Sequence, residues 1–355
     1  MSRIDAHAHV SVPAELWAYK AGLLSHRGAH GFRPPTISDD QLIEAYHKKE
    51  MAPVGHLESM KKNGIDLQLI SPRPFQMMQS EKYKLVRAFT EAVNDIIYRD
   101  TQLFPGVFYG VCSMPQAAGE PIEKALPELE RCIKELGFVG TLLNPDPYEN
   151  TGTEAPPLGD KYWYPLYEKL CELDVPAHIH GTTSHSERTP YTLHFINEET
   201  IAVYGLVNSN VFKDFPTLKV IVSHGGGAIP YQFGRFQSGS MRNPVGERFS
   251  DGLKKLYFDT VLYTESAMKL LVEVMGSDNL VFGAECPGVG SSVNPDTGNT
   301  FDHNVPFIEN MASLNEQQKR DILENNARRL YNIPTAKAGA AKSLAAHLVA
   351  GYFCE

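Results

Sequence analysis

The sequence lacks the features of several large classes of protein. Its 355 residues include only five cysteines, an odd number with no C-x-x-C spacing, which argues against a disulfide framework and against a zinc ribbon. No apolar run approaches the roughly 18 residues of a membrane-spanning helix, and the first residues lack the basic and apolar pattern of a signal peptide. We therefore expect a cytoplasmic protein that is not inserted in a membrane.

Positive charge is also scarce. The chain has 33 lysine and arginine residues against 42 aspartate and glutamate residues, a formal net charge of −9. Nucleic acids and anionic membrane surfaces need a basic face on their partners, so neither is expected to bind here. No G-x-G-x-x-G motif follows the first predicted strand and no Walker loop is present, which disfavours a doubly wound nucleotide-binding sheet. A small molecule is the expected partner.

What the sequence does contain is a regular alternation of apolar, strand-like runs with segments of helical periodicity. The eight predicted strands are residues 4–9, 67–71, 107–111, 138–143, 176–180, 220–224, 256–259 and 280–283. Helices are predicted between them, among others over 202–212, and after the last strand over 316–329. This alternation predicts an α/β fold, a (β/α)8 barrel of the TIM type. The barrel is expected to span residues 1–333, with a helical tail over residues 334–355.

Two long segments interrupt the alternation, at residues 11–62 and 287–306. Both follow the carboxyl ends of predicted strands, where barrel enzymes place their active sites. We therefore expect loop insertions that form lids or walls over the site, within a single domain. A homo-oligomer is also expected, because closed symmetric assemblies are common among such enzymes.

Histidines mark the ends of the predicted strands. His7 and His9 alternate in the first strand, so both side chains point to the same side, although two solvated histidines would give the same pattern. Three further runs end in His180, His224 and Glu285. Because the carboxyl ends of all strands meet at one mouth of a barrel, these side chains are expected to converge there. Imidazoles and a carboxylate that converge in this way predict a metal site.

The residues around these strand ends resemble the amidohydrolase superfamily, and within it the branch that contains decarboxylases and hydratases. The motifs that carry the resemblance are Ile4-Asp5-Ala6-His7-Ala8-His9, Ile179-His180, Ser223-His224-Gly225-Gly226, Phe282-Gly283-Ala284-Glu285 and Asn325-Asn326-Ala327-Arg328-Arg329-Leu330-Tyr331. The resemblance implies a metal-dependent enzyme with one divalent ion, for which zinc is the expected metal. The ligands that it implies are His7, His9, His180 and Glu285.

The eighth strand narrows the resemblance. Most members of the branch carry aspartate where this chain has Glu285, whereas 4-oxalomesaconate hydratases carry glutamate. The resemblance to those hydratases implies a hydro-lyase that adds water to the double bond of 4-oxalomesaconate, or of a closely related unsaturated oxo-carboxylate, in the protocatechuate 4,5-cleavage route of aromatic-acid catabolism. A non-oxidative decarboxylase of an aromatic or unsaturated acid, a metal-dependent hydrolase and a non-catalytic metal-binding barrel are the alternatives.

Several side chains are assigned roles toward such a polycarboxylate substrate. His224 is expected to act as a general acid or base, because histidine titrates near neutral pH, and Glu285 either to bind the metal, to move protons or to do both. Fixed cations are needed to bind carboxylates inside an acidic protein. The predicted substrate contacts are Arg73, Arg235, Asn144 and Tyr191. Among the other histidines, His178 is expected to be buried one layer below His180, and His194 to be solvated in a loop.

Overall fold

The computed structural model describes residues 1–242 and 244–334, and the described chain forms one parallel sheet of eight strands in the order β1 to β8. The strands are β1 (Ile4–His9), β2 (Leu67–Ser71), β3 (Phe108–Cys112), β4 (Gly140–Leu143), β5 (Ala177–Ile179), β6 (Val220–Val222), β7 (Tyr257–Asp259) and β8 (Leu280–Val281). Each lies within about one residue of a predicted run or inside it. Apart from Pro334, the helical tail predicted over residues 334–355 lies outside the described residues.

The sheet closes on itself between its first and last strands. The amide of Ala6 donates to the carbonyl of Phe282, and the amide of Glu285 donates to the carbonyl of His7, both at 2.9 Å. The strands therefore form a barrel, and the predicted (β/α)8 fold is confirmed.

Alternation along β1 explains how the barrel presents its histidines. Ile4 and Ala6 belong to an apolar cluster that they share with neighbouring strands. The pairing of β1 with β2 shifts register between Asp5 and Ala8, and Ala8 lies in the larger cluster that packs against the helices. His7 and His9, on either side of Ala8, therefore share the opposite side of the strand. Every residue of β1 is buried, so the polar side chains are held inside a rigid apolar frame.

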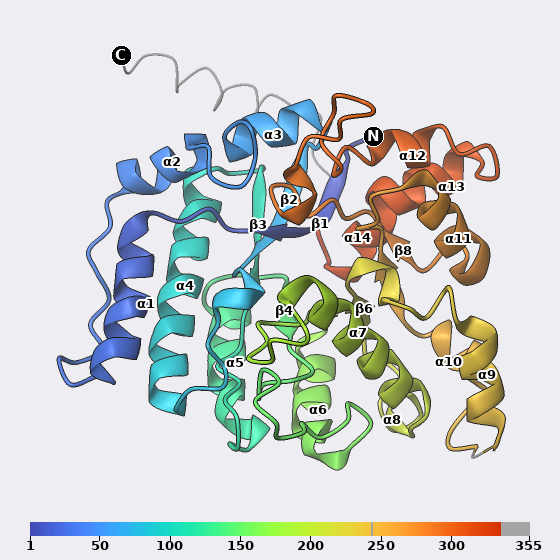
Figure 1. Ribbon diagram of the computed structural model, residues 1–355, viewed down its shortest axis with the longest axis horizontal. Helices are drawn as coiled ribbons and strands as arrows, with labels where there is room; N and C mark the ends of the chain where they lie inside the picture. Colours follow the sequence, from blue (N-terminus) through green and yellow to red (C-terminus); the bar gives the residue numbers. More distant parts are fainter. Residues whose placement is uncertain (243, 335–355) are drawn as a thin grey trace.

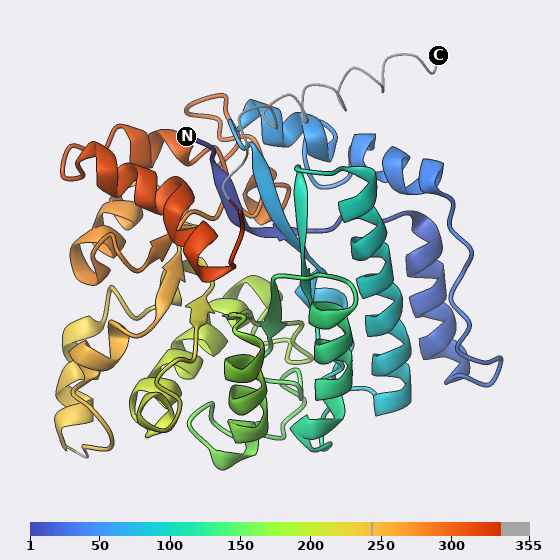
Figure 2. The same cartoon turned by 180° about the vertical axis from the view of Figure 1, so that it is seen from behind.

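Helices surround the strands (Figures 1 and 2). They are α1 (Ala14–His26), α2 (Asp39–His47), α3 (His56–Lys62), α4 (Tyr83–Leu103), α5 (Leu126–Lys134), α6 (Tyr164–Leu173), α7 (Tyr191–Val207), α8 (Val211–Asp214), α9 (Phe233–Arg242), α10 (Phe249–Leu253), α11 (Glu265–Met275), α12 (Val305–Glu309), α13 (Glu316–Arg320) and α14 (Asn326–Leu330). No helix within the described ranges is long and apolar enough to cross a membrane.

The first long insertion, residues 11–62, is largely helical. Its helices α1 and α2 lie against α4 in the outer layer, at the left of Figure 1. Leu16 and Leu23 of α1 and Leu42 of α2 are buried there. This part of the insertion thus extends the helical layer of the barrel, because its apolar side chains need a packing surface.

Helix α7 differs most from its prediction. It begins at Tyr191, well before the predicted start, and ends at Val207. As a consequence His194 lies on a helix and is 2% exposed, so the prediction that it is solvated in a loop was wrong. The helix predicted over residues 316–329 is also interrupted, by a π-helical turn at Asp321–Asn325 between α13 and α14.

Candidate metal centre

Three imidazoles from two strands meet at the mouth of the barrel. His7 and His9 belong to β1, and His180 directly follows β5. The ring centroid of His7 lies 5.1 Å from that of His9 and 4.9 Å from that of His180, and the rings of His9 and His180 are 5.3 Å apart. All three side chains are at most 3% exposed. The strands therefore bring together the three predicted histidine ligands.

The Nδ1 atom of each of these rings is hydrogen-bonded within the protein. Nδ1 of His7 lies 2.6 Å from Asp259 Oδ2, Nδ1 of His9 lies 3.0 Å from Ser71 Oγ, and Nδ1 of His180 lies 2.6 Å from the carbonyl oxygen of the next residue. The Ser71 hydroxyl donates to a backbone carbonyl, so it accepts from His9. With Nδ1 as the donor, each ring presents the lone pair of Nε2 to the space between the rings.

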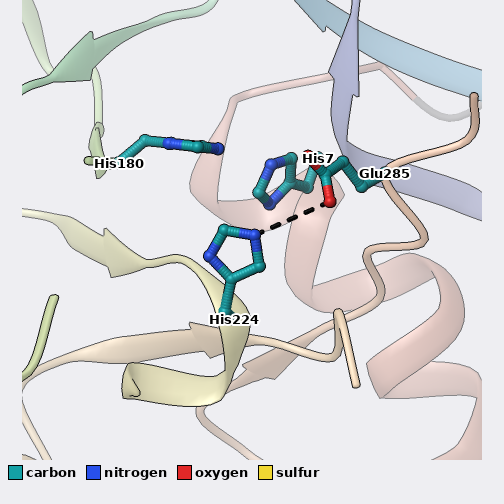
Figure 3. A group of neighbouring side chains, drawn as sticks. All are labelled: His7, His180, His224 and Glu285. Carbon is teal, nitrogen blue, oxygen red and sulfur yellow. Dashed lines mark ion pairs between the residues drawn. The ribbon is translucent and has the colours of Figure 1, made fainter. Parts of the chain in front are cut away.

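The Nε2 atoms of His7, His9 and His180 are buried and have no hydrogen-bond partner among the described residues. Unpaired buried polar atoms are costly and uncommon, so three in one place require an explanation. Histidine Nε2 with Nδ1 hydrogen-bonded is the usual state of a metal-binding imidazole. The three histidines therefore fit a divalent metal ion. Four side chains offer one donor atom each within 4.8 Å of one another: His7, His180, His224 and Glu285 (Figure 3).

His224 and Glu285 face each other beside the three rings. Nδ1 of His224 donates to the carboxylate of Glu199, with Nδ1 2.8 and 3.0 Å from the two oxygens. Its Nε2 atom lies 3.6 Å from Glu285 Oε2, the pair marked by the dashed line in Figure 3. The hydroxyl of Tyr263 donates to the same Glu285 oxygen at 2.8 Å, and the other oxygen lies 3.6 Å from His9 Nε2. Glu285 is thus placed between the imidazole cluster and His224.

The surroundings set different charges on these groups. Burial lowers the pKa of His9 to about 4 and the pKa of His180 well below its usual range, which keeps both rings neutral. Burial alone would lower the pKa of His224, but the carboxylates of Glu199 and Glu285 raise it well above the usual range. Burial alone would raise the pKa of Glu285, but His224 and His9 lower it well below the usual range. Burial alone would lower the pKa of His7, but the carboxylate of Asp259 raises it above the usual value. The neutral rings of His9 and His180 thus lie beside an imidazolium and a carboxylate.

The backbone at these two residues is unusual. His224 has φ 50° and Glu285 has φ 54°, in the left-handed region that residues other than glycine rarely adopt. After His224 the chain passes against its neighbours so closely that a Cβ at Gly226 would lie 2.7 Å from the Phe258 ring. Such conformations persist only where the surrounding structure holds them, and they gather at functional sites.

The predicted substrate contacts differ in their positions. Arg73 is 5% exposed, and its Nη2 atom is buried without a hydrogen-bond partner in the described chain. Asn144 is buried, but its amide nitrogen is close to Gln79, Asp146 and Thr182, so it is already used within the protein. Arg73 is therefore better suited than Asn144 to bind a ligand.

The other two predicted contacts lie farther out. Tyr191 is 44% exposed, and its ring packs at a tilt against Phe195, whose ring contacts His180 and His224. Arg235, on α9, is not brought to the histidines within this chain. It lines a separate cavity of about 850 Å³, together with residues of α7 that include Thr200, Ile201 and Tyr204.

Sequence reasoning missed three residues that hold the centre together: Asp259, Glu199 and Tyr263. Asp259 Oδ2 lies 2.6 Å from His7 Nδ1 and 3.2 Å from His178 Nε2, so His178 is buried beside the centre, as predicted. Asp259 ends a predicted barrel strand, and that position alone could have marked it. Glu199 lies on a helix and Tyr263 in a loop, where sequence periodicity gives no comparable signal.

The family model for amidohydrolases matches residues 4–333. The chain belongs to the amidohydrolase family. Among curated amidohydrolase relatives, 2-keto-4-carboxy-3-hexenedioate hydratase of Sphingobium sp. SYK-6 is 35% identical over 347 residues, covering 96% of this chain and 99% of that protein. Gamma-resorcylate decarboxylase of Polaromonas sp. JS666 is 25% identical over 295 residues, covering 77% of this chain and 85% of that protein.

Two solved structures resemble this chain. The crystal structure of 4-oxalomesaconate hydratase from Rhodopseudomonas palustris matches this amidohydrolase with a TM-score of 0.82 and 33% identity, covering 99% of this chain and 98% of that one. Dihydroxybenzoic acid decarboxylase from Polaromonas sp. JS666, crystallised with bound manganese, matches with a TM-score of 0.69 and 22% identity, covering 94% of this chain and 98% of that one. The second likeness is one of fold.

Proposed function

We propose that this amidohydrolase is a metal-dependent hydratase that adds water to the carbon–carbon double bond of 4-oxalomesaconate or a closely related unsaturated oxo-carboxylate. The observation that carries the proposal is the position of Glu285. The barrel places a glutamate from the eighth strand end between the imidazole cluster and His224, and the hydratase relatives match almost the whole chain.

The proposed ligands of the divalent ion are His7, His9 and His180, with Glu285 as the fourth. The unpaired, buried Nε2 atoms of the three histidines support this assignment. Zinc is the proposed metal, because three neutral imidazoles and one carboxylate suit its usual coordination. A divalent ion in this position would supply positive charge that stabilises negative charge developing on a substrate oxygen.

The proposed substrate is a tricarboxylate with a ketone conjugated to its double bond. Its negative charge requires a cation within the pocket, and Arg73 fits this need because its guanidinium is buried with one nitrogen unpaired. Its Nη1 atom lies 3.5 Å from the carbonyl oxygen of Pro287, which holds the side chain beside the loop that follows Glu285. We assign Arg73 as a carboxylate clamp.

Hydration needs two proton transfers. The water oxygen bonds to the carbon beta to the ketone while water loses a proton, and the neighbouring alpha carbon gains a proton. We assign the acceptor role to Glu285, which Tyr263 orients, and the donor role to Nε2 of His224, which Glu199 orients through Nδ1. The proton taken from water returns from Glu285 to His224 for the next cycle. Because the two groups lie 3.6 Å apart, beyond hydrogen-bond length, this transfer requires a small approach of the side chains or one bridging water.

Decarboxylation is the second candidate, because the family also includes decarboxylases that match about three quarters of the chain. Proton NMR of zinc-loaded protein with 4-oxalomesaconate in D2O separates the two reactions. Appearance of 4-carboxy-4-hydroxy-2-oxoadipate with deuterium at carbon 3 would establish the hydratase. Release of CO2 would identify a decarboxylase instead, and an inert substrate would contradict the proposed substrate.

A further inference from the structure

A second group of potential metal ligands lies outside the centre described above. One donor atom each from Asp146, His194 and Glu198 lies within 4.8 Å of the other two. None of these residues belongs to the histidine centre.

Two elements of the barrel carry this second group. His194 and Glu198 are one helical turn apart on α7, so they share a face of that helix. Asp146 lies in the loop after β4, where its two carboxylate oxygens accept from the amides of Tyr148 at 3.0 Å and Asn150 at 2.7 Å. The backbone thus fixes Asp146 opposite the helix.

His194 has the feature that marks the ligands of the first centre. It is 2% exposed, and its Nε2 atom is buried without a hydrogen-bond partner in the part of the chain that the structure describes. Nε2 lies 3.9 Å from Asp146 Oδ2, and Nδ1 lies 3.9 Å from Glu198 Oε1. Both separations exceed hydrogen-bond length. One ring binds a given ion through a single nitrogen, and Nε2 lies as far from Asp146 Oδ2 as two donors that are each about 2.1 Å from a common ion can lie.

Access and charge also suit a cation. Asp146 and Glu198 line a cavity of about 500 Å³, which offers room for an ion and its water molecules. The charge of Glu149, buried in the same loop as Asp146, is offset by the Lys20 ammonium. Burial and the nearby Asp146 carboxylate raise the pKa of Glu198 to about 7, so a bound cation would favour its ionised form. Carboxylates gathered in this way attract a divalent cation.

We propose that Asp146, His194 and Glu198 bind a second divalent cation, of the Mn²⁺ and Zn²⁺ class. One imidazole nitrogen with two carboxylate oxygens is a donor set that such ions accept and that is less suited to Mg²⁺. The bound ion joins the loop after β4 to α7, the helix that carries Glu199 to His224. The second site therefore fixes α7 against the loop that follows β4.

Counting bound Mn²⁺ by electron paramagnetic resonance on metal-stripped protein tests this proposal. Two ions per chain are expected for the wild type, and one each for His180→Ala, which damages the histidine centre, and Glu198→Gln, which damages the second site. Glu154→Gln is the matched control, because Glu154 lines the same cavity but is exposed and outside the ligand group. This control should keep two ions.

The variants separate the two sites from each other and from the proposed activity. Glu198→Gln that binds as many Mn²⁺ ions as the wild type, or His180→Ala that binds none, would overturn the second site. Mn²⁺ should also raise the melting temperature of His180→Ala, and His194→Gln added to that variant should abolish the rise. A rise that persists in this double variant would contradict the role of His194.

Discussion

Two histidine–carboxylate clusters contact neighbouring faces of α7, and they are built in different ways. In the first, the imidazoles come from barrel strands, and Phe195 and Glu199 of α7 contact His180 and His224. In the second, both His194 and Glu198 come from α7 itself. Strand ends fix side chains through the sheet, whereas the second cluster depends on how one helix and one loop pack. The first is suited to chemistry and the second to holding the helix in place.

The largest expected effect is at the first cluster. Substitution His180→Ala removes one of three converging Nε2 atoms and should eliminate both the ion of that centre and measurable turnover. Metal analysis and the NMR assay measure the two losses. His30→Ala, at an exposed histidine, is the control and should keep both, and a metal-loaded, active His180→Ala would refute the ligand assignment.

His224→Gln sharpens the distinction between a ligand and a proton donor. If His224 only transfers a proton, kcat should fall on the order of 10²- to 10⁴-fold while the metal content of the centre is unchanged. The metal content and kcat are measured on the same sample. Loss of the ion together with activity would instead place His224 among the ligands.

Adjacent residues on α7 allow a matched test of the two clusters. Glu199→Gln removes the carboxylate that orients His224 and should lower kcat about 10- to 100-fold, as is typical when the partner of a functional histidine is lost. It should leave both Mn²⁺ ions in place, whereas Glu198→Gln should lose one. Loss of an ion from Glu199→Gln would show that the clusters are not independent.

The two predicted arginine clamps form another contrast. Arg73→Ala should lower kcat/KM about 30-fold, the effect of losing roughly 2 kcal/mol from a charged hydrogen bond. Steady-state kinetics of Arg73→Ala and Arg235→Ala measure both. Unchanged kinetics in Arg73→Ala would remove it from the pocket, and a fall of equal size in Arg235→Ala would show that this side chain reaches the substrate although it lies apart from the histidines in one chain.

The smallest expected effect concerns the support of a single ring. Ser71→Ala removes the hydroxyl that accepts from His9 Nδ1 and should weaken metal binding about tenfold. Competition with a chelator measures this affinity. Ser80→Ala is the control for the histidine centre, because the Ser80 hydroxyl donates to Glu149 and not to a histidine of that centre. Equal affinities in both variants would contradict the role of Ser71.

The difference between side chains fixed at strand ends and side chains placed by helix packing explains what the sequence could predict. His7, His9 and His180 could be placed because side chains alternate along a strand and parallel strands end at one mouth. Glu199 and His194 could not, because α7 begins at Tyr191, where the residues lack a clear helical pattern and packing against the barrel decides the structure. The position of Arg235 likewise depends on the rotation of α9, which a single sequence does not specify.

The hydrogen bonds that join β1 to β8 also bear on the order in which the protein is made. His7 and His9 leave the ribosome more than 200 residues before Asp259 and Glu285. Throughout that interval the nascent chain carries exposed imidazoles and lacks the carboxylates that orient and complete the centre. High-affinity metal binding at the histidine centre is therefore expected only after β8 has paired with β1.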